Sequence, residues 1–267
     1  MRRMQPIELT SAPASAQVAL ALWSHWAQAA EPAQAIAPRT GTHAPAHLLA
    51  WSVKPDTGHA YALAATQRYC HLRGLDTPPP SAWEWLQCDR EVSRCARLRN
   101  GGLRVATPEP NNIVGVMLLV HELCHASLEW HKPGSLADTE HTETFALAGE
   151  LFAQQWLLGP ECPEHSSLSL VQAIASWTQE REHEFGTRHA ALARFEWLLW
   201  SAAQRSPAPM HVQTFTEATW QRAHAEFGLV ATPDRWATHP LITRKPGSAG
   251  VYPTAWRAAR SEVLCAA

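Results

Sequence analysis

Lysine and tyrosine are scarce in this chain of 267 residues. Each occurs three times, the lysines at positions 54, 132 and 245, so the 22 basic residues are almost all arginine. The 24 acidic residues balance them to a formal net charge of -2. This balance provides no general attraction to nucleic acid or to anionic lipid, so a partner must be recognised by a local site.

Long apolar runs are also missing. The longest, Ile113 to Val120, has eight residues including a glycine, whereas a membrane-spanning helix needs about 20. The N-terminus starts with basic residues, but its apolar stretch VALALW ends at Ser24 and is too short for a signal peptide. The six cysteines show no paired short spacing of the zinc-ribbon or secreted type. We therefore expect a cytoplasmic protein with reduced thiols and no membrane span.

Turn signals divide the chain into mostly helical blocks, and no internal repeat is visible. The sequence predicts an α+β fold that is predominantly α, with residues 1–13 as a tail, 14–205 as a mainly helical domain, and 206–267 as a proline-punctuated extension packed on that domain. Short strands are expected at 47–53 and 103–107. Helices are expected at about 14–30, 57–73, 81–99, from Asn111 or Asn112 onward, 138–158, 168–186, 188–204, 216–227 and 254–264.

The most informative stretch is VHELCHASLEW, residues 120–130. On a helix, His121 and His125 lie one turn apart on one face and can direct two imidazole nitrogens at one point, with Glu122 beside it. This is the H-E-x-x-H arrangement that binds Zn²⁺ and uses the glutamate as a base. A chance match is the alternative, because 15 histidines and 19 glutamates produce this pattern in random order with a probability of about 0.06.

Two features of the context favour a metal site. The preceding run NIVGVMLLV is apolar almost all round, so the helix should be buried, and a buried His-Glu-His group without partners costs several kcal/mol. A turn signal, KPGS at 132–135, is followed by a second amphipathic segment that begins near Asp138. At 1.5 Å per residue, His125 and Glu143 lie about 10 Å and about 7.5 Å from the bend, so they can face each other across a helical hairpin. Glu140 and His141 are alternative third ligands.

The combination of HELCH with TETFA, in which Glu143 follows His125 by eighteen residues, resembles the zincin metallopeptidases, and specifically the gluzincins. The resemblance covers about residues 103–158. It implies a zincin-like core with a small sheet, an active-site helix and a following ligand-bearing helix. It also implies that LRVAT at 103–107 is the sheet-edge strand that binds extended substrate. The carboxylate that usually orients a zinc-binding histidine is replaced by Leu147, and Glu150 or Asp138 are candidates for its role.

The resemblance predicts a Zn²⁺-dependent peptidase with ligands His121, His125 and Glu143 and with Glu122 as general base, acting on a peptide or protein substrate. Tyr252, His211 and His239 are candidate donors to the oxyanion. The alternative is a zincin-like protein of the antirestriction or mobile-element type that binds a partner or nucleic acid and keeps a structural or vestigial metal. That alternative depends on a helical stripe of Arg90, Arg94 and Arg97.

Overall fold

The computed structural model describes residues 50–88, 93–205, 212–232, 236, 239 and 248–266. The chain divides into two units, one with the described residues up to His183 together with 254–266, the other with residues 184–253. The sequence analysis instead places a domain edge at 205/206, and its domain boundaries stay a prediction. The predicted tail, the helix at 14–30 and the start of the strand at 47–53 lie outside the described residues.

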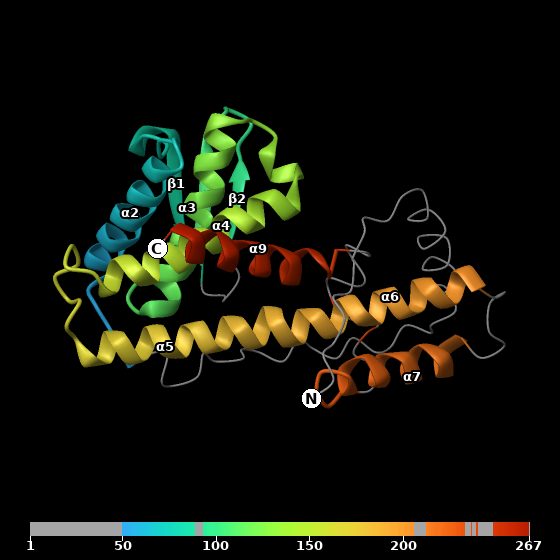
Figure 1. The fold of residues 1–267 in the computed structure, drawn as a ribbon. Helices are drawn as coiled ribbons and strands as arrows, with labels where there is room; N and C mark the ends of the chain where they lie inside the picture. Colours follow the sequence, from blue (N-terminus) through green and yellow to red (C-terminus); the bar gives the residue numbers. More distant parts are fainter. Residues whose placement is uncertain are drawn as a thin grey trace. The chain divides into compact units, whose positions relative to one another are not determined.

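The first unit combines helices with a small sheet; in Figure 1 these elements run from blue to yellow, and the C-terminal helix of the same unit is red. Among the residues of the second unit that the structure describes are a π-helical turn and two helices. The described part is thus mostly helical with one small sheet, as expected. The first unit contains α2 (Pro55–Leu72), β1 (Trp83–Gln87), β2 (Arg94–Arg97), β3 (Leu103–Thr107), α3 (Ile113–His131), α4 (Thr139–Leu158), α5 (Leu168–His183) and most of α9 (Val251–Ala266); the second contains the π-helical turn Glu184–Arg188, α6 (His189–Arg205) and α7 (Val212–Ala225).

Helix α3 forms the centre of the first unit. It starts where predicted, because the side chain of Asn112 accepts a hydrogen bond from the Gly115 N–H and caps the first turn. It packs against α2, α4, α5, β2 and β3. Among the described residues, α3 is the one helix long and apolar enough to cross a membrane. However, 89% of its apolar 18-residue stretch is buried inside the protein. Its apolar surface is therefore covered by protein, as in the core helix of a soluble protein.

The turn between α3 and α4 is tied to both α3 and the sheet by one buried carboxylate. Glu129, 2% exposed, accepts hydrogen bonds from the backbone N–H groups of Gly134 (2.9 Å) and Leu136 (3.1 Å) and from the Arg97 guanidinium (2.7 Å). Gly134 has a φ of 90°, which few other residues adopt without strain. Asp138 then caps α4 by accepting from His141 N–H. The predicted helical hairpin is confirmed.

The sheet has the strand order β1-β3-β2, with β1 parallel and β2 antiparallel to β3. The strand predicted at 103–107 is confirmed as β3, and Leu103 and Val105 are fully buried. The expectation that this strand lies at the sheet edge is wrong, because both of its sides are paired. The antiparallel edge strand next to α3 is β2. Sequence could not show this, because edge position depends on which distant strand pairs on each side.

The helix predicted over 81–99 is also wrong: β1 and β2 occupy this part of the chain. Trp83 and Trp85 are half-buried and alternate with the exposed Glu84. Their two-residue spacing is the period of a strand rather than a helix. The Trp85 indole N–H donates to the Thr107 hydroxyl on the neighbouring β3 at 2.9 Å. Cross-strand pairing with β3 thus overrides the local capping signal at Ser81.

The remaining predicted elements lie close to the observed ones. The helices expected at 57–73, 138–158, 168–186, 188–204, 216–227 and 254–264 correspond to α2, α4, α5, α6, α7 and α9. In the second unit, α6 and α7 pack through Phe195 and Trp220, whose rings meet edge to face. Of the strand predicted at 47–53, the structure describes residues 50–53, where Ser52 makes an isolated antiparallel bridge to Asn112.

Candidate metal centre

Three predicted ligands converge at the facing sides of α3 and α4. The ligand atoms of His121, His125 and Glu143 all lie within 4.8 Å of one another. The two Nε2 atoms are 3.0 Å apart, and the Glu143 carboxylate oxygens lie 3.3 Å from His121 Nε2 and 3.8 Å from His125 Nε2. The side chains of the three residues are only 11%, 8% and 12% exposed. The hairpin therefore produces the juxtaposition that the sequence predicts.

These spacings fit a zinc ion. Around tetrahedral zinc, nitrogen and oxygen ligands lie about 2.0–2.1 Å from the metal, which separates two such atoms by about 3.3 Å. The observed separations of 3.0, 3.3 and 3.8 Å bracket this value. Two imidazoles and one carboxylate are also a common donor set for zinc that retains an open position. The group could therefore hold a metal ion.

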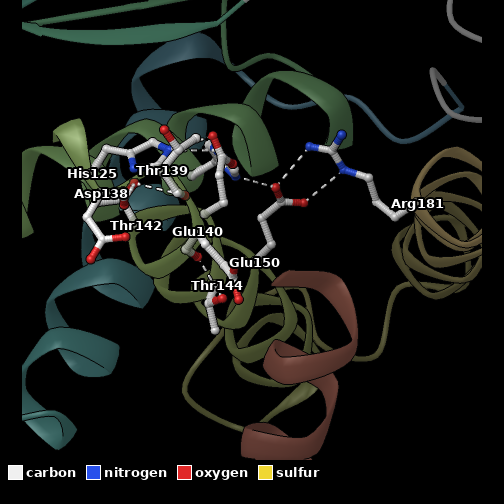
Figure 2. A network of polar contacts seen from close by, with 10 residues as sticks. His125, Asp138, Thr139, Glu140, Thr142, Thr144, Glu150 and Arg181 are labelled. Carbon is white, nitrogen blue, oxygen red and sulfur yellow. Dashed lines mark hydrogen bonds and ion pairs between the residues drawn. The ribbon is translucent and has the colours of Figure 1, made fainter. Parts of the chain in front are cut away.

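A carboxylate from the next turns of α4 orients the first histidine. The Nδ1–H of His121 donates to Glu150 Oε1 at 2.7 Å, and Glu150 is fully buried. Glu150 is held in turn by Arg181 of α5, the ion pair drawn in Figure 2. The sequence left this role open between Glu150 and Asp138. Glu150 occupies the position, while Asp138 is used as the cap of α4.

The two histidines have opposite electrostatic environments. Burial disfavours a charged His121, but hydrogen bonds to Glu143 and then Glu150 outweigh burial and raise its pKa to about 10. The pKa of His125 falls to about 4, because it is buried and lies beside the positive charge of His121. Burial acts to raise the pKa values of Glu143 and Glu150. Their charged partners outweigh burial, so both pKa values are lowered. A cation at this point would take the place of a proton that the site already attracts.

Glu122 lies next to the ligands with one oxygen unused. The residue is 4% exposed, and Oε2 has no hydrogen-bond partner among the described residues. Burial raises the pKa of Glu122 to about 7, although the charge of His121 and a hydrogen bond from Ser93 act against the rise. Ser93 immediately precedes β2. A carboxylate with a near-neutral pKa and a free oxygen can exchange a proton at physiological pH.

The alternative third ligands do not join the group. Glu140 and His141 lie in the first turn of α4 and are exposed to solvent. Glu143 lies one turn further along the helix and faces α3. Leu147, four residues beyond Glu143, is fully buried.

The candidate oxyanion donors are not assigned by the structure. Tyr252 belongs to the second unit, where its ring stacks on Phe185 and lies 4.9 Å from the ring of His189. His239 is also in that unit, and His211 lies outside the described residues. A role for any of the three stays a prediction.

The predicted arginine stripe is not formed. Arg94 and Arg97 lie on a strand, where residues three apart point to opposite faces, and Arg90 lies outside the described residues. Arg97 donates two hydrogen bonds to Glu129: Nε donates to the carboxylate and Nη2 to the backbone oxygen. The partner-binding alternative therefore loses the feature on which it depended.

Sequence reasoning missed three residues that contact the site: Ser93, Trp177 and Arg181. The two on α5 are four residues apart and so share a helical face, but nothing local indicates that this face meets Glu150. Only the packing of α5 against α3 and α4 brings them there.

No protein-family model matches the chain, and comparisons with curated proteins and with solved structures likewise find no match.

Proposed function

We propose that the protein is a zinc-dependent metallopeptidase of the gluzincin type. One observation carries the proposal: the convergence of His121, His125 and Glu143 beside the buried, unpartnered Oε2 of Glu122. A buried carboxylate oxygen without a hydrogen-bond partner costs free energy unless a ligand satisfies it. A metal ion with a purely structural role does not require a carboxylate oxygen beside it that binds nothing. Hydrolysis does require one, as the base that takes a proton from water.

The roles of the residues follow from their positions. His121, His125 and Glu143 would hold the ion, which supplies Lewis acidity that activates water and polarises a peptide carbonyl near neutral pH. Glu122 accepts the proton of the attacking water at Oε2 and later donates it to the leaving amine. Ser93 holds Glu122 from the sheet side, and Glu150 keeps the proton on His121 Nδ1, so Nε2 points to the ion.

The edge strand β2 supports a peptide as substrate. It pairs with β3 on one side, and no described strand pairs with its other side. Cys95, in the middle of β2, is close enough to Glu122 for the carboxylate charge to add to burial in raising the cysteine pKa to about 12. A peptide added to β2 in extended form would thus lie near the proposed base. Cytoplasmic location also remains part of the proposal.

The proposal is tested with Glu122→Gln, which keeps the size of the side chain but cannot accept a proton. The variant should bind one zinc ion per chain and lose hydrolysis of a fluorogenic peptide library by about 100-fold or more. Glu140→Gln, on an exposed site in the same hairpin, is the matched control and should behave as the unmodified protein. Full hydrolysis by Glu122→Gln would refute the role of Glu122. Absence of zinc in the unmodified protein, or its retention by His125→Ala, would refute the metal site.

A further inference from the structure

The carboxylate of Glu150 has every acceptor position occupied. Oε1 accepts from His121 Nδ1 at 2.7 Å and from Arg181 Nη2 at 2.9 Å. Oε2 accepts from Arg181 Nε at 3.0 Å and from the Trp177 indole N–H at 3.2 Å. A carboxylate offers about four lone-pair sites. Glu150 is fully buried, so these four donors alone determine how it is oriented.

Three of the four donors come from α5, a helix outside the hairpin that carries the ligands. The Arg181 guanidinium binds both carboxylate oxygens, and it also lies over the Trp177 ring, 4.3 Å from the centroid. Its side chain is 14% exposed. Figure 2 shows the side chains of Glu150 and Arg181 directed at each other, with two dashed contacts from the carboxylate to the guanidinium. The planar fork of an arginine defines the plane of a carboxylate as well as its position.

We propose that Arg181 is a positioning residue of the metal centre: by holding the plane of Glu150 it directs the Glu150–His121 hydrogen bond and thereby the Nε2 of His121 toward the ion. The inference rests on the metal site of the proposed function and is independent of hydrolysis. Arg181 is not one of the three candidate ligands, and its hydrogen bonds to the centre run through Glu150. Helix α5 is therefore part of the metal site.

The decisive variant is Arg181→Lys, because it keeps the positive charge and removes the fork. A change of charge would by itself alter the affinity for any cation, so Arg181→Met alone could not separate orientation from electrostatics. Lysine places a single ammonium near Glu150 and cannot bind both oxygens in one plane. Arg181→Lys should weaken zinc binding about 10-fold, the lower end of the effect of losing an outer hydrogen-bond partner. Zinc affinity is measured by competition with a chromophoric chelator on the full chain.

A double-mutant cycle with Glu150→Gln tests the route of the effect. If Arg181 acts through Glu150, then Arg181→Lys should change zinc affinity by less than about 2-fold in the Glu150→Gln background. The imidazole Nδ1 proton of His121 gives an independent readout by NMR. It should exchange slowly with solvent in the zinc-loaded protein and faster in zinc-loaded Arg181→Lys, an effect that a purely structural role would not produce.

Thr178→Val is the matched control. Thr178 lies on α5 between Trp177 and Arg181 and donates to Gln154 Oε1 of α4 at 2.7 Å, so it joins the same two helices without touching Glu150. Its loss should lower stability and leave zinc affinity unchanged. If Arg181→Lys does not fold, Trp177→Phe is measured instead. This variant removes one hydrogen-bond donor to Glu150 and keeps an aromatic ring beside Arg181, and it should weaken zinc binding by a few-fold.

The outcomes separate this inference from the proposed function. Unchanged zinc affinity in Arg181→Lys, an equal loss in the Glu150→Gln background, or an equal loss in Thr178→Val would each overturn the role of Arg181. None of these results depends on whether the protein hydrolyses peptides. Conversely, a protein that binds zinc through Arg181-dependent geometry and cleaves no peptide would leave the inference standing and overturn the peptidase assignment.

Discussion

Substituting alanine for Gly149 should destabilise the protein, although alanine is the better helix former. Gly149 lies within α4 where this helix crosses α3. A Cβ at this position would lie 2.4 Å from Cys124 Sγ and 3.3 Å and 3.4 Å from two ring carbons of Tyr69. Ordinary contacts between such atoms are about 3.5–4.0 Å long. The helices would therefore have to separate by about 1 Å at this point, or the sulfur would have to move within a packed core.

The expected magnitude is a balance of two terms. Overpacking a core by one methyl group costs about 1–3 kcal/mol, while replacing glycine by alanine in a helix interior gains about 1 kcal/mol. Cys124 is fully buried, so its sulfur cannot move out into solvent. We expect the cost to exceed the gain, so that Gly149→Ala lowers the free energy of unfolding by up to about 2 kcal/mol.

The double variant Cys124→Ala/Gly149→Ala provides the control. Cys124→Ala alone should cost about 1 kcal/mol, because it leaves a small cavity. Together the two changes should be less destabilising than their sum by about 1–2 kcal/mol, since the new methyl group occupies the space of the missing sulfur. Urea denaturation of the zinc-free protein, followed by circular dichroism, measures all four forms. A Gly149→Ala protein as stable as the unmodified one, or additive effects, would refute the close approach of α3 and α4.

Three further predictions concern the turn and the metal. Glu129→Ala should lower the free energy of unfolding by about 3 kcal/mol at neutral pH, because several buried donors lose their acceptor. Burial opposes ionisation of Glu129, but hydrogen bonds from Gly134 and then Arg97 lower its pKa from 4.5. The contribution of Glu129 to stability is therefore complete above pH 4.5 and is lost as the pH falls through the lower pKa of the folded state. The difference in urea stability between the unmodified protein and Glu129→Ala should narrow in acid, and a constant difference would contradict this. Glu143→Ala should weaken zinc binding by about 100-fold or more, whereas Glu140→Ala, measured by the same chelator competition, should not change it. Zinc at a concentration of 100 times its dissociation constant should stabilise the protein by about 2.7 kcal/mol, seen as a higher melting temperature that a chelator abolishes; an unchanged melting temperature would argue against a site in the folded state.

Several site features were readable because they depend on local geometry. The four-residue spacing of His121 and His125 defines a common face on any helix. The caps Asn112 and Asp138, with the turn between them, define a hairpin, and similar distances from its bend place His125 opposite Glu143. Glu150 could be named only as a candidate, because the helical period alone does not show which residue of α4 reaches the far nitrogen of His121.

The sheet was predicted less well because its contacts are not local. The segment 81–99 carries a capping serine and apolar residues that also suit a helix, and its conversion into β1 and β2 depends on pairing with β3. The alternation of Trp83 and Trp85 was the one local signal for a strand. The position of β3 in the middle of the sheet likewise follows from two pairings, one parallel and one antiparallel. Neither pairing can be deduced from the residues of β3 alone.

The amino-acid sequence by itself determined the helical hairpin and the side chains that meet across it, since helix period, caps and the turn are properties of neighbouring residues. Only the tertiary structure decided which strand lies at the sheet edge and that Arg181 and Trp177 hold Glu150. The contacts of Trp177 and Arg181 with Glu150 join residues 27 or more positions apart. Packing selects such contacts, like the pairing of the strands, from many that the local sequence would equally allow.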